Sequence, residues 1–298
     1  MNDLAFLICV EHGRLESEGV VLCESIRRWA GAASQAPIYA FTPRPHKLPE
    51  PATLEQLRAL DVTQIDEPLE GLREDLPTFN KVYACAWAER ELAHETLVFA
   101  DTDSVFLNEP NELLEGDWVA AARPVDRRIA GSRGKGKNEP FWRRMYEALG
   151  VTAEPFVETA VGNQRIRAYW NSGLIAAKRE AGLFALWQHA LETLYEKDLI
   201  YFRMEKFMDQ ISWAGASANY ADRMRTLSHT YNYPLRQRGG LPAASRDLDL
   251  AEIVQLHYRL FLHLPDPLAA VEPPFDPSTP QYQWLAERLP LEPIVDEA

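Results

Sequence analysis

A short apolar segment that ends in two acids constrains this chain more than any other feature. Residues 97–100 are apolar, Asp101, Thr102 and Asp103 follow, and apolar residues resume at 105–107. The pattern predicts a buried strand of an α/β sheet, with both carboxylates on one face about 6.6 Å apart along the backbone. Because such a pair repels itself unless a cation is near, it predicts a Mg²⁺ or Mn²⁺ site beyond the carboxyl end of the strand. A solvated turn after the strand is the alternative interpretation.

The composition narrows the class of protein. The chain has 298 residues and a net charge of −13, which argues against nucleic acid or an anionic membrane surface as the main partner. No apolar run approaches the roughly 20 residues of a transmembrane segment, and residues 4–10 lack the flanks of a signal peptide. The odd set of three cysteines, Cys9, Cys23 and Cys85, predicts buried thiols and not disulfides or a zinc site. We therefore expect a cytoplasmic protein.

The first part of the chain alternates between strand and helix patterns. Apolar segments at 4–10, 37–41 and 62–65 are separated by amphipathic segments at 17–30 and 53–60. This β-α-β-α-β order predicts a parallel sheet of the mononucleotide-binding type. The chain has no GxGxxG or GxxxxGK(S/T) sequence, so neither a Rossmann nor a P-loop phosphate site is expected. Later strands are predicted at 118–123, 227–233 and 253–258, and helices at 78–93, 181–196 and 207–216.

Two later segments indicate contact with a ligand. Residues 126–140 carry five basic side chains and three glycines in an otherwise acidic chain, which predicts a mobile surface loop. A lid over a negatively charged substrate and a plain solvated loop are the two interpretations. Asn171, Ser172 and Gly173 interrupt a strand pattern at 168–177, which predicts a bulge where a ligand approaches the backbone.

Five short blocks in a fixed order carry a resemblance to a known family. They are Asp101-Thr102-Asp103, Asn171-Ser172-Gly173, Asp209-Gln210, the YNYP sequence at 231–234 and the QLHY sequence at 255–258. On these blocks the chain, from residue 4 to about 258, resembles the metal-dependent GT-A glycosyltransferases, most closely glycosyltransferase family 8. The resemblance implies a hexosyltransferase that uses a nucleotide sugar.

The resemblance also implies a fold and its division. We expect an α/β, Rossmann-like GT-A fold with a mixed, mainly parallel central sheet and helices on both faces. Residues 1–264 would form a single catalytic domain, with a nucleotide-binding half at 1–107 and a sugar- and acceptor-binding half at 108–264. Residues 265–298 are expected to be a C-terminal tail, rich in proline and acid, with one short helix.

The resemblance assigns roles to residues in and around these blocks. Asp101, Asp103 and His257 would hold Mn²⁺ or Mg²⁺ on the diphosphate of the donor. Gln210, Asp209 and Asp103 would form the catalytic group, with Gln210 near the anomeric carbon of the sugar. The residues expected to bind the donor are Val10, Glu11, Lys81, Asp101, Thr102, Asn171, Ser172, Gly173 and Arg259. The donor is expected to be a UDP-sugar, the acceptor a hydroxyl of a sugar, glycan or small molecule, and the anomeric configuration to be retained.

One departure from the family pattern leaves other functions open. The family usually carries a glycine and then Lys-Pro-Trp after the histidine, whereas residues 258–263 read YRLFLH. Either Arg259, Arg236 or Arg238 replaces the lysine that binds the diphosphate, or diphosphate binding is weakened. A catalytically weak nucleotide-sugar or carbohydrate-binding protein of the same fold is the first alternative. A phosphohydrolase with an Asp nucleophile is the second, although no later paired-acid block accompanies these acids.

Overall fold

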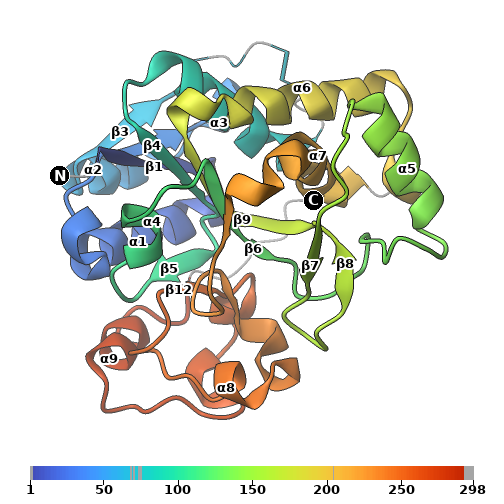
Figure 1. Cartoon of the computed structure of the whole chain (residues 1–298). Helices are drawn as coiled ribbons and strands as arrows, with labels where there is room; N and C mark the ends of the chain where they lie inside the picture. Colours follow the sequence, from blue (N-terminus) through green and yellow to red (C-terminus); the bar gives the residue numbers. More distant parts are fainter. Residues whose placement is uncertain (1–2, 68, 70, 73–75, 204, 292–298) are drawn as a thin grey trace.

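A mixed seven-stranded sheet lies at the centre of the computed structural model, which describes residues 3–67, 69, 71–72, 76–203 and 205–291 (Figure 1). In spatial order its strands are β10 (Met224–Thr226), β6 (Ala120–Pro124), β9 (Trp170–Lys178), β4 (Thr96–Ala100), β1 (Leu4–Cys9), β2 (Ile38–Phe41) and β3 (Val62–Ile65). β9 runs antiparallel to β4 and β6, and the other pairs are parallel. The predicted mixed, mainly parallel sheet is therefore confirmed.

Helices cover both faces of this sheet, as predicted, because alternate residues of its buried strands point to opposite sides. On β1, Ala5 and Leu7 belong to one hydrophobic core, whereas Phe6 and Ile8 belong to another. The first core contains residues of α3 (Asn80–Glu91), α5 (Glu139–Ala148), α6 (Leu183–Glu196) and α7 (Met208–Ser217). The second contains residues of α1 (Arg14–Trp29), α2 (Pro51–Ala59) and α4 (Asn111–Leu114).

A third core joins a small sheet to the C-terminal part of the chain. The small sheet consists of β11 (Tyr233–Pro234), β12 (Gln255–His257) and β5 (Ser104–Phe106), and α8 (Ala243–Arg246) and α9 (Pro280–Ala286) lie near it (Figure 1). Val105 of β5 shares this core with Leu256 of β12 and with Trp284 of α9. The expected boundary at 264 lies inside this core, so the division of the chain into domain and tail stays a prediction. Residues 292–298 of the expected tail lie outside the described residues.

One local prediction is wrong, and a second stays a prediction. The strand expected at 227–233 is not formed: β10 ends at Thr226, residues 227–232 form turns or irregular backbone, and β11 has only two residues. In the loop at 126–140 four of the five basic side chains are exposed and Arg128 is half-buried, so the loop lies at the surface, and its mobility stays a prediction. The loop is anchored through Asn138, whose amide donates to Ile129 O and Gly131 O at 3.1 and 2.8 Å. Buried polar side chains that bond to the backbone hold this loop in place, which its composition alone did not indicate.

The predicted irregularity at residues 171–173 is confirmed, but within a continuous strand. On β6, Ala122 pairs with Ile175 and Pro124 pairs with Trp170, so the extra residues of β9 lie between these two pairs. A second small sheet, formed by β7 (Phe156–Glu158) and β8 (Arg165–Arg167), lies beside this end of β9 (Figure 1). The polar triplet therefore lies where β9 is not regularly paired with β6.

Candidate functional site

The two acids lie on the short connection between β4 and β5. Asp101 N–H donates to Gly173 O at 2.9 Å, which extends the pairing of β4 with β9 by one residue. Ser104 Oγ donates to Asp101 O at 2.6 Å and closes the turn around Asp103. β4 is wholly buried, so the chain exposes these carboxylates only at the point where it leaves the main sheet.

His257 is brought to the acids by the small sheet. β12 pairs antiparallel with β5, and His257 lies opposite Ser104. Among the described residues, Asp101, Asp103 and His257 form a group whose ligand atoms all lie within 4.8 Å of one another, with His257 Nε2 3.2 Å from Asp103 Oδ1. Burial alone would raise the pKa of Asp103, but the charge and hydrogen bond of His257 lower it to about 2. The carboxylate is therefore ionised and ready to bind a cation.

The surroundings of His257 fit a role as a metal ligand. Asn232 Oδ1 lies 2.7 Å from His257 Nδ1 and accepts its proton, while Nε2 faces the acids. A cation bound there would replace the proton on Nε2 and take its lone pair. A Cβ at Gly173 would lie 2.9 Å from His257 Cε1, so this position must lack a side chain. Two carboxylates and one imidazole suit Mn²⁺ or Mg²⁺. The residues present thus fit a divalent cation.

Lys81 lies against the same acids from the first turn of α3. Its Nζ is 2.5 Å from Asp101 Oδ1 and 3.6 Å from Asp209 Oδ2. Burial would lower the pKa of this ammonium, but the two carboxylates outweigh burial and raise the pKa above its ordinary value. A fixed positive charge therefore lies between the two acidic groups.

Asp209 and Asn171 add polar atoms to the site at the beginning of β9. Ser172 Oγ donates to Asp209 Oδ2 at 2.6 Å, and Gly173 N–H donates to Asn171 Oδ1 at 2.9 Å. Asp209 Oδ1 is buried and has no hydrogen-bond partner within the described part of the chain. A buried carboxylate oxygen without a partner is costly, so this atom is a natural acceptor for a ligand hydroxyl.

Two cavities open on either side of these residues. The first, called here the Asp101 cavity, has a volume of about 250 Å³, and its lining includes Glu11, Arg14, Lys81, Asp101, Thr102 and Asp103. The second, called the Gln210 cavity, has a volume of about 430 Å³, and its lining includes Arg127, Tyr169, Asn171, Lys206, Gln210 and Arg259. The two cavities share no lining residue. Lys81 lines the Asp101 cavity and contacts Asp209, the chain neighbour of Gln210 in the other lining, so this contact links the two cavities.

Two of the residues expected to bind the donor, Val10 and Glu11, already use their polar atoms in contacts within the protein. Val10 uses its backbone N–H and C=O in bonds to Phe41 O and Thr42 Oγ1, and its side chain packs on Gly19. Glu11 lines the Asp101 cavity, but its carboxylate is already held by the Arg44 guanidinium.

The three arginines considered as replacements for the family lysine differ in position. Arg259 lines the Gln210 cavity and not the Asp101 cavity. Arg238 is buried, with Nη1 donating to Leu248 O at 2.7 Å and Nε to Pro273 O at 3.1 Å, so it is used for structure. Arg236 is exposed and lines neither cavity.

Sequence reasoning missed Arg14, which lines the Asp101 cavity. Its guanidinium pairs with the buried carboxylate of Glu18, which also accepts from Thr102 Oγ1 at 3.3 Å. The missed signal was the start of α1, which begins at Arg14 and not at residue 17 as expected. A guanidinium has five donors, so Arg14 can pair with Glu18 and still donate to an anion in this cavity.

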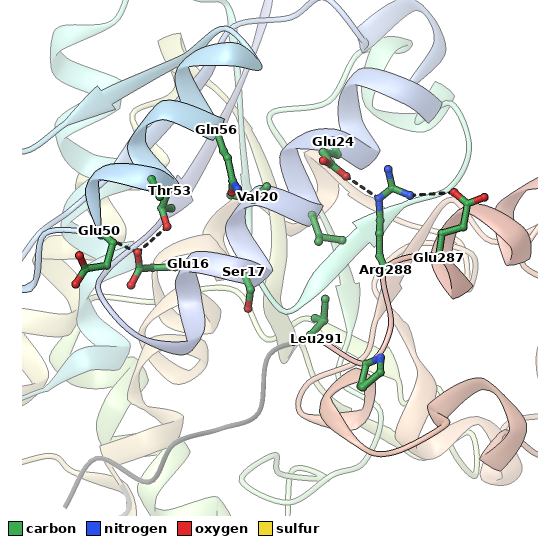
Figure 2. Close-up of a pocket in the computed structure, with 13 residues that line it drawn as sticks. Glu16, Ser17, Val20, Glu24, Glu50, Thr53, Gln56, Glu287, Arg288 and Leu291 are labelled. Atoms are coloured by element: carbon green, nitrogen blue, oxygen red, sulfur yellow. Dashed lines mark hydrogen bonds and ion pairs between the residues drawn. The ribbon is translucent and has the colours of Figure 1, made fainter.

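The largest cavity described lies elsewhere, between α1, α2 and the segment at 287–291 (Figure 2). It has a volume of about 710 Å³, but none of the expected site residues line it. Its acids are engaged locally: Glu16 Oε2 accepts from Glu50 N–H and Thr53 Oγ1, both at 2.7 Å, and Glu24 pairs with Arg288. Size alone therefore does not identify the functional site.

Comparison with known proteins places the chain among glycosyltransferases. Residues 6–218 match the family described as the Rhodobacterales glycosyltransferase domain. No curated protein sequence matches significantly. No helix among the described residues is long and apolar enough to cross a membrane.

Solved structures show the same fold at low sequence identity. The galactosyltransferase LgtC, in complex with donor and acceptor sugar analogues, matches with a TM-score of 0.57 at 13% identity over 97% of both chains. The bifunctional glycosyltransferase WbbM matches with a TM-score of 0.54 at 13% identity, and the match covers 97% of this chain but only 52% of WbbM. Mouse xyloside xylosyltransferase 1 matches with a TM-score of 0.50 at 12% identity, over 86% of this chain and 98% of the other. These likenesses confirm the predicted α/β GT-A fold.

Proposed function

Because the chain belongs to the Rhodobacterales glycosyltransferase domain family, we propose that it transfers a hexose from a UDP-sugar to an acceptor hydroxyl, with retention of configuration, at a Mn²⁺ or Mg²⁺ site of the family 8 type. The observation that carries this proposal is the convergence of Asp101, Asp103 and His257 beside Lys81. A diphosphate is the ligand that such a combination of metal ligands and fixed cation suits.

The Asp101 cavity would take the nucleotide diphosphate. Asp101, Asp103 and His257 would hold the cation, which when bound neutralises the negative charge that builds on the leaving diphosphate. Lys81 and Arg14 would contact phosphate oxygens from α3 and α1. Arg14 is thus our candidate for the charge that the absent Lys-Pro-Trp lysine supplies in the family.

The sugar of the donor would lie between the two cavities. Asp209 Oδ1 and the amides of Asn171 and Gln210 would hold its hydroxyls; the unpartnered Asp209 Oδ1 and the position of Asn171 and Gln210 in the cavity lining support this role. In the reaction, the acceptor oxygen forms a bond to the anomeric carbon while the bond from that carbon to the diphosphate oxygen breaks. The proton of the acceptor hydroxyl passes to the departing diphosphate oxygen, so attack and departure occur on one face. An amide such as Gln210 is a poor nucleophile, which favours this route over a covalent intermediate.

A thermal-shift screen with UDP and other nucleoside diphosphates, with Mn²⁺ and with chelator, tests the proposal. We expect UDP to stabilise the protein only when the metal is present, since a ligand of the folded state raises stability with the logarithm of its concentration over Kd. Asp103→Asn should weaken metal-dependent binding by about 100-fold. Asp222→Asn, a change at an exposed acid outside both cavities, should leave it intact.

The outcomes separate the transferase from its alternatives. Release of UDP from a UDP-sugar, dependent on metal, supports the transferase, whereas binding without release supports a carbohydrate-binding protein. Release of inorganic phosphate from simple esters would support the phosphohydrolase. No stabilisation by any nucleotide in the presence of metal would contradict the proposed site.

A further inference from the structure

The Gln210 cavity has a surplus of positive charge, although the chain as a whole carries −13. Arg127, Lys206 and Arg259 line it, and none of the three forms an ion pair within the described residues. The only acid in the lining is Asp126, whose Oδ1 accepts from Arg123 Nη2 at 2.5 Å and is thereby neutralised. Three uncompensated cations around one cavity favour an anionic occupant.

The position of the cavity identifies which reactant it holds. Asn171 and Gln210 are in its wall, whereas their neighbours Ser172 and Asp209 bond to each other on the side that faces Lys81. The nucleotide diphosphate is assigned above to the other cavity. The Gln210 cavity therefore remains for the acceptor, an assignment that rests on the proposed function.

The cations are held by ordered backbone and not by a loose loop. Asp126 O accepts from Val161 N–H at 2.8 Å, and Ile129 O accepts from Tyr201 Oη at 3.2 Å, so Arg127 lies between two anchored residues. Lys206 Nζ lies 5.4 Å from the centre of the Phe207 ring, which also lines the cavity. The backbone that carries Arg127 is thus anchored at the edge of the cavity, while the exposed side chains of Arg127, Lys206 and Arg259 are free to pair with an anion.

We propose that the acceptor is an anionic sugar, carrying a carboxylate or a phosphate ester that contacts Arg127, Lys206 and Arg259 while a neighbouring hydroxyl faces Gln210. The guanidinium groups of Arg127 and Arg259 match the oxygens of either group, and the ammonium of Lys206 adds a point charge. The rings of Tyr169 and Phe207 in the lining supply apolar surface for the face of the sugar. The basic segment at 126–140 thereby contributes to substrate selection.

Calorimetric titration of the protein loaded with Mn²⁺ and UDP tests this proposal. The probes are methyl galactoside, methyl galacturonide and galactose 6-phosphate, which separate a neutral sugar, a carboxylate and a phosphate ester. We expect an anionic probe to bind about tenfold more tightly than the neutral one, and the preference to shrink as salt is added. The galacturonide and the phosphate ester compared with each other identify which anion the acceptor carries.

Charge-removing variants then locate the binding. Arg127→Gln and Lys206→Gln should each remove most of the preference for the anionic probe. Lys135→Gln is the matched control, since Lys135 is exposed in the same loop but does not line the cavity. Equal affinity for charged and neutral sugars, or equal effects of Lys135→Gln and Lys206→Gln, would overturn the proposal.

Two further outcomes keep this inference distinct from the proposed function. If the cavity variants instead weaken binding of a UDP-uronic acid relative to UDP-galactose, the anion belongs to the donor and the acceptor assignment is wrong. If UDP does not bind at all, the proposed function fails, and titration of the unloaded protein still reports whether the cavity prefers anionic sugars.

Discussion

Gly173 leaves room for His257 in the candidate metal site because it has no side chain. A Cβ at this position would lie 2.9 Å from His257 Cε1 and 3.0 Å from Asn232 Oδ1. The first contact is shorter than Cβ atoms in proteins show and the second is tight, so His257 or the backbone of β9 would have to shift. The hydrogen bond from His257 to Asn232 and its approach to Asp103 therefore depend on one small residue in β9.

We expect Gly173→Ala to weaken Mn²⁺ binding by at least about tenfold while the protein stays folded, because the added methyl group would displace the His257 ring that binds the ion. Titration of Mn²⁺ followed by electron paramagnetic resonance measures the change. Gly239→Ala is the control, since an added Cβ there meets nothing within 4 Å. Unchanged Mn²⁺ affinity in Gly173→Ala would exclude His257 from the metal site.

At the scale of single residues, the local sequence pattern indicated the two acids but not the residues that surround them. Asp101 and Asp103 stand out because an apolar strand ends abruptly at them. Asn232 and Arg14 could not be assigned in the same way, since one contacts His257 through a turn and the other enters from a helix whose start was misplaced. Residues of this kind depend on contacts between distant segments, which spacing along the chain does not encode.

At the scale of elements, α5 and β8 are joined by a buried ion pair. Arg167 Nη2 donates to Glu139 Oε1 at 2.7 Å and Nε donates to Oε2 at 3.0 Å. Ser132 Oγ donates to the same carboxylate at 2.6 Å and connects it to the loop before α5. The hydrogen bonds from Arg167 lower the pKa of Glu139 to about 2, from an ordinary value of 4.5.

Because the folded pKa of Glu139 is depressed, its contribution to stability is complete above pH 4.5 and is lost as pH falls toward about 2. Glu139→Gln should reduce the free energy of unfolding by about 3 kcal/mol at pH 7, since it leaves the buried guanidinium without its partner. Denaturant titrations at pH 7 and near pH 3 should show the difference between wild type and variant shrinking in acid.

Glu154 offers a matched control for this ion pair. Its Oε1 lies 3.4 Å from Arg167 Nη2, but its side chain is 61% exposed. Glu154→Gln should therefore change stability by less than about 0.5 kcal/mol. Equal losses in the two variants would show that burial does not set the strength of this pair.

The helices and strands were predicted correctly where the pattern of apolar residues was strong. The prediction failed where only a few residues pair with a neighbouring strand. The strands at the start of the chain are buried on both faces, and their apolar runs marked them clearly. The segment at 227–233 has an aromatic, strand-like composition, yet Tyr231 and Tyr233 are buried by packing into two different cores. The composition of this segment therefore predicted correctly that its tyrosines are buried, but predicted wrongly that the segment forms a strand.

At the scale of the whole molecule, the C-terminal segment completes a core shared with the site. Leu285 and Trp284 of α9 pack in the third core with Val105 and Leu107, which directly follow the two acids. The expectation of a tail came from its prolines and acids, which describe its surface and not its buried residues. α9 therefore packs against β5, the strand that directly follows Asp103.

Leu285→Ala should lower the free energy of unfolding by about 3 kcal/mol, because Leu285 is fully buried and its loss leaves a cavity. Leu264→Ala, at a leucine 47% exposed, should cost much less. Differential scanning calorimetry would compare the two. A separate low-temperature transition in Leu285→Ala, with the main transition unchanged, would instead show that the C-terminal segment unfolds independently.

The antiparallel strand β9 has a consequence for how this protein tolerates insertions and deletions. Residues 175–177 of β9 pair with β4 on one side and β6 on the other, and this register fixes where the irregular segment with Asn171 and Ser172 begins. Asn171 lines the Gln210 cavity, whereas Ser172 bonds to Asp209. A slip of one residue would exchange these two side chains across the sheet. The positions of the site residues on β9 therefore depend on the register of this one strand. We expect insertions and deletions to be tolerated only in the loops outside it.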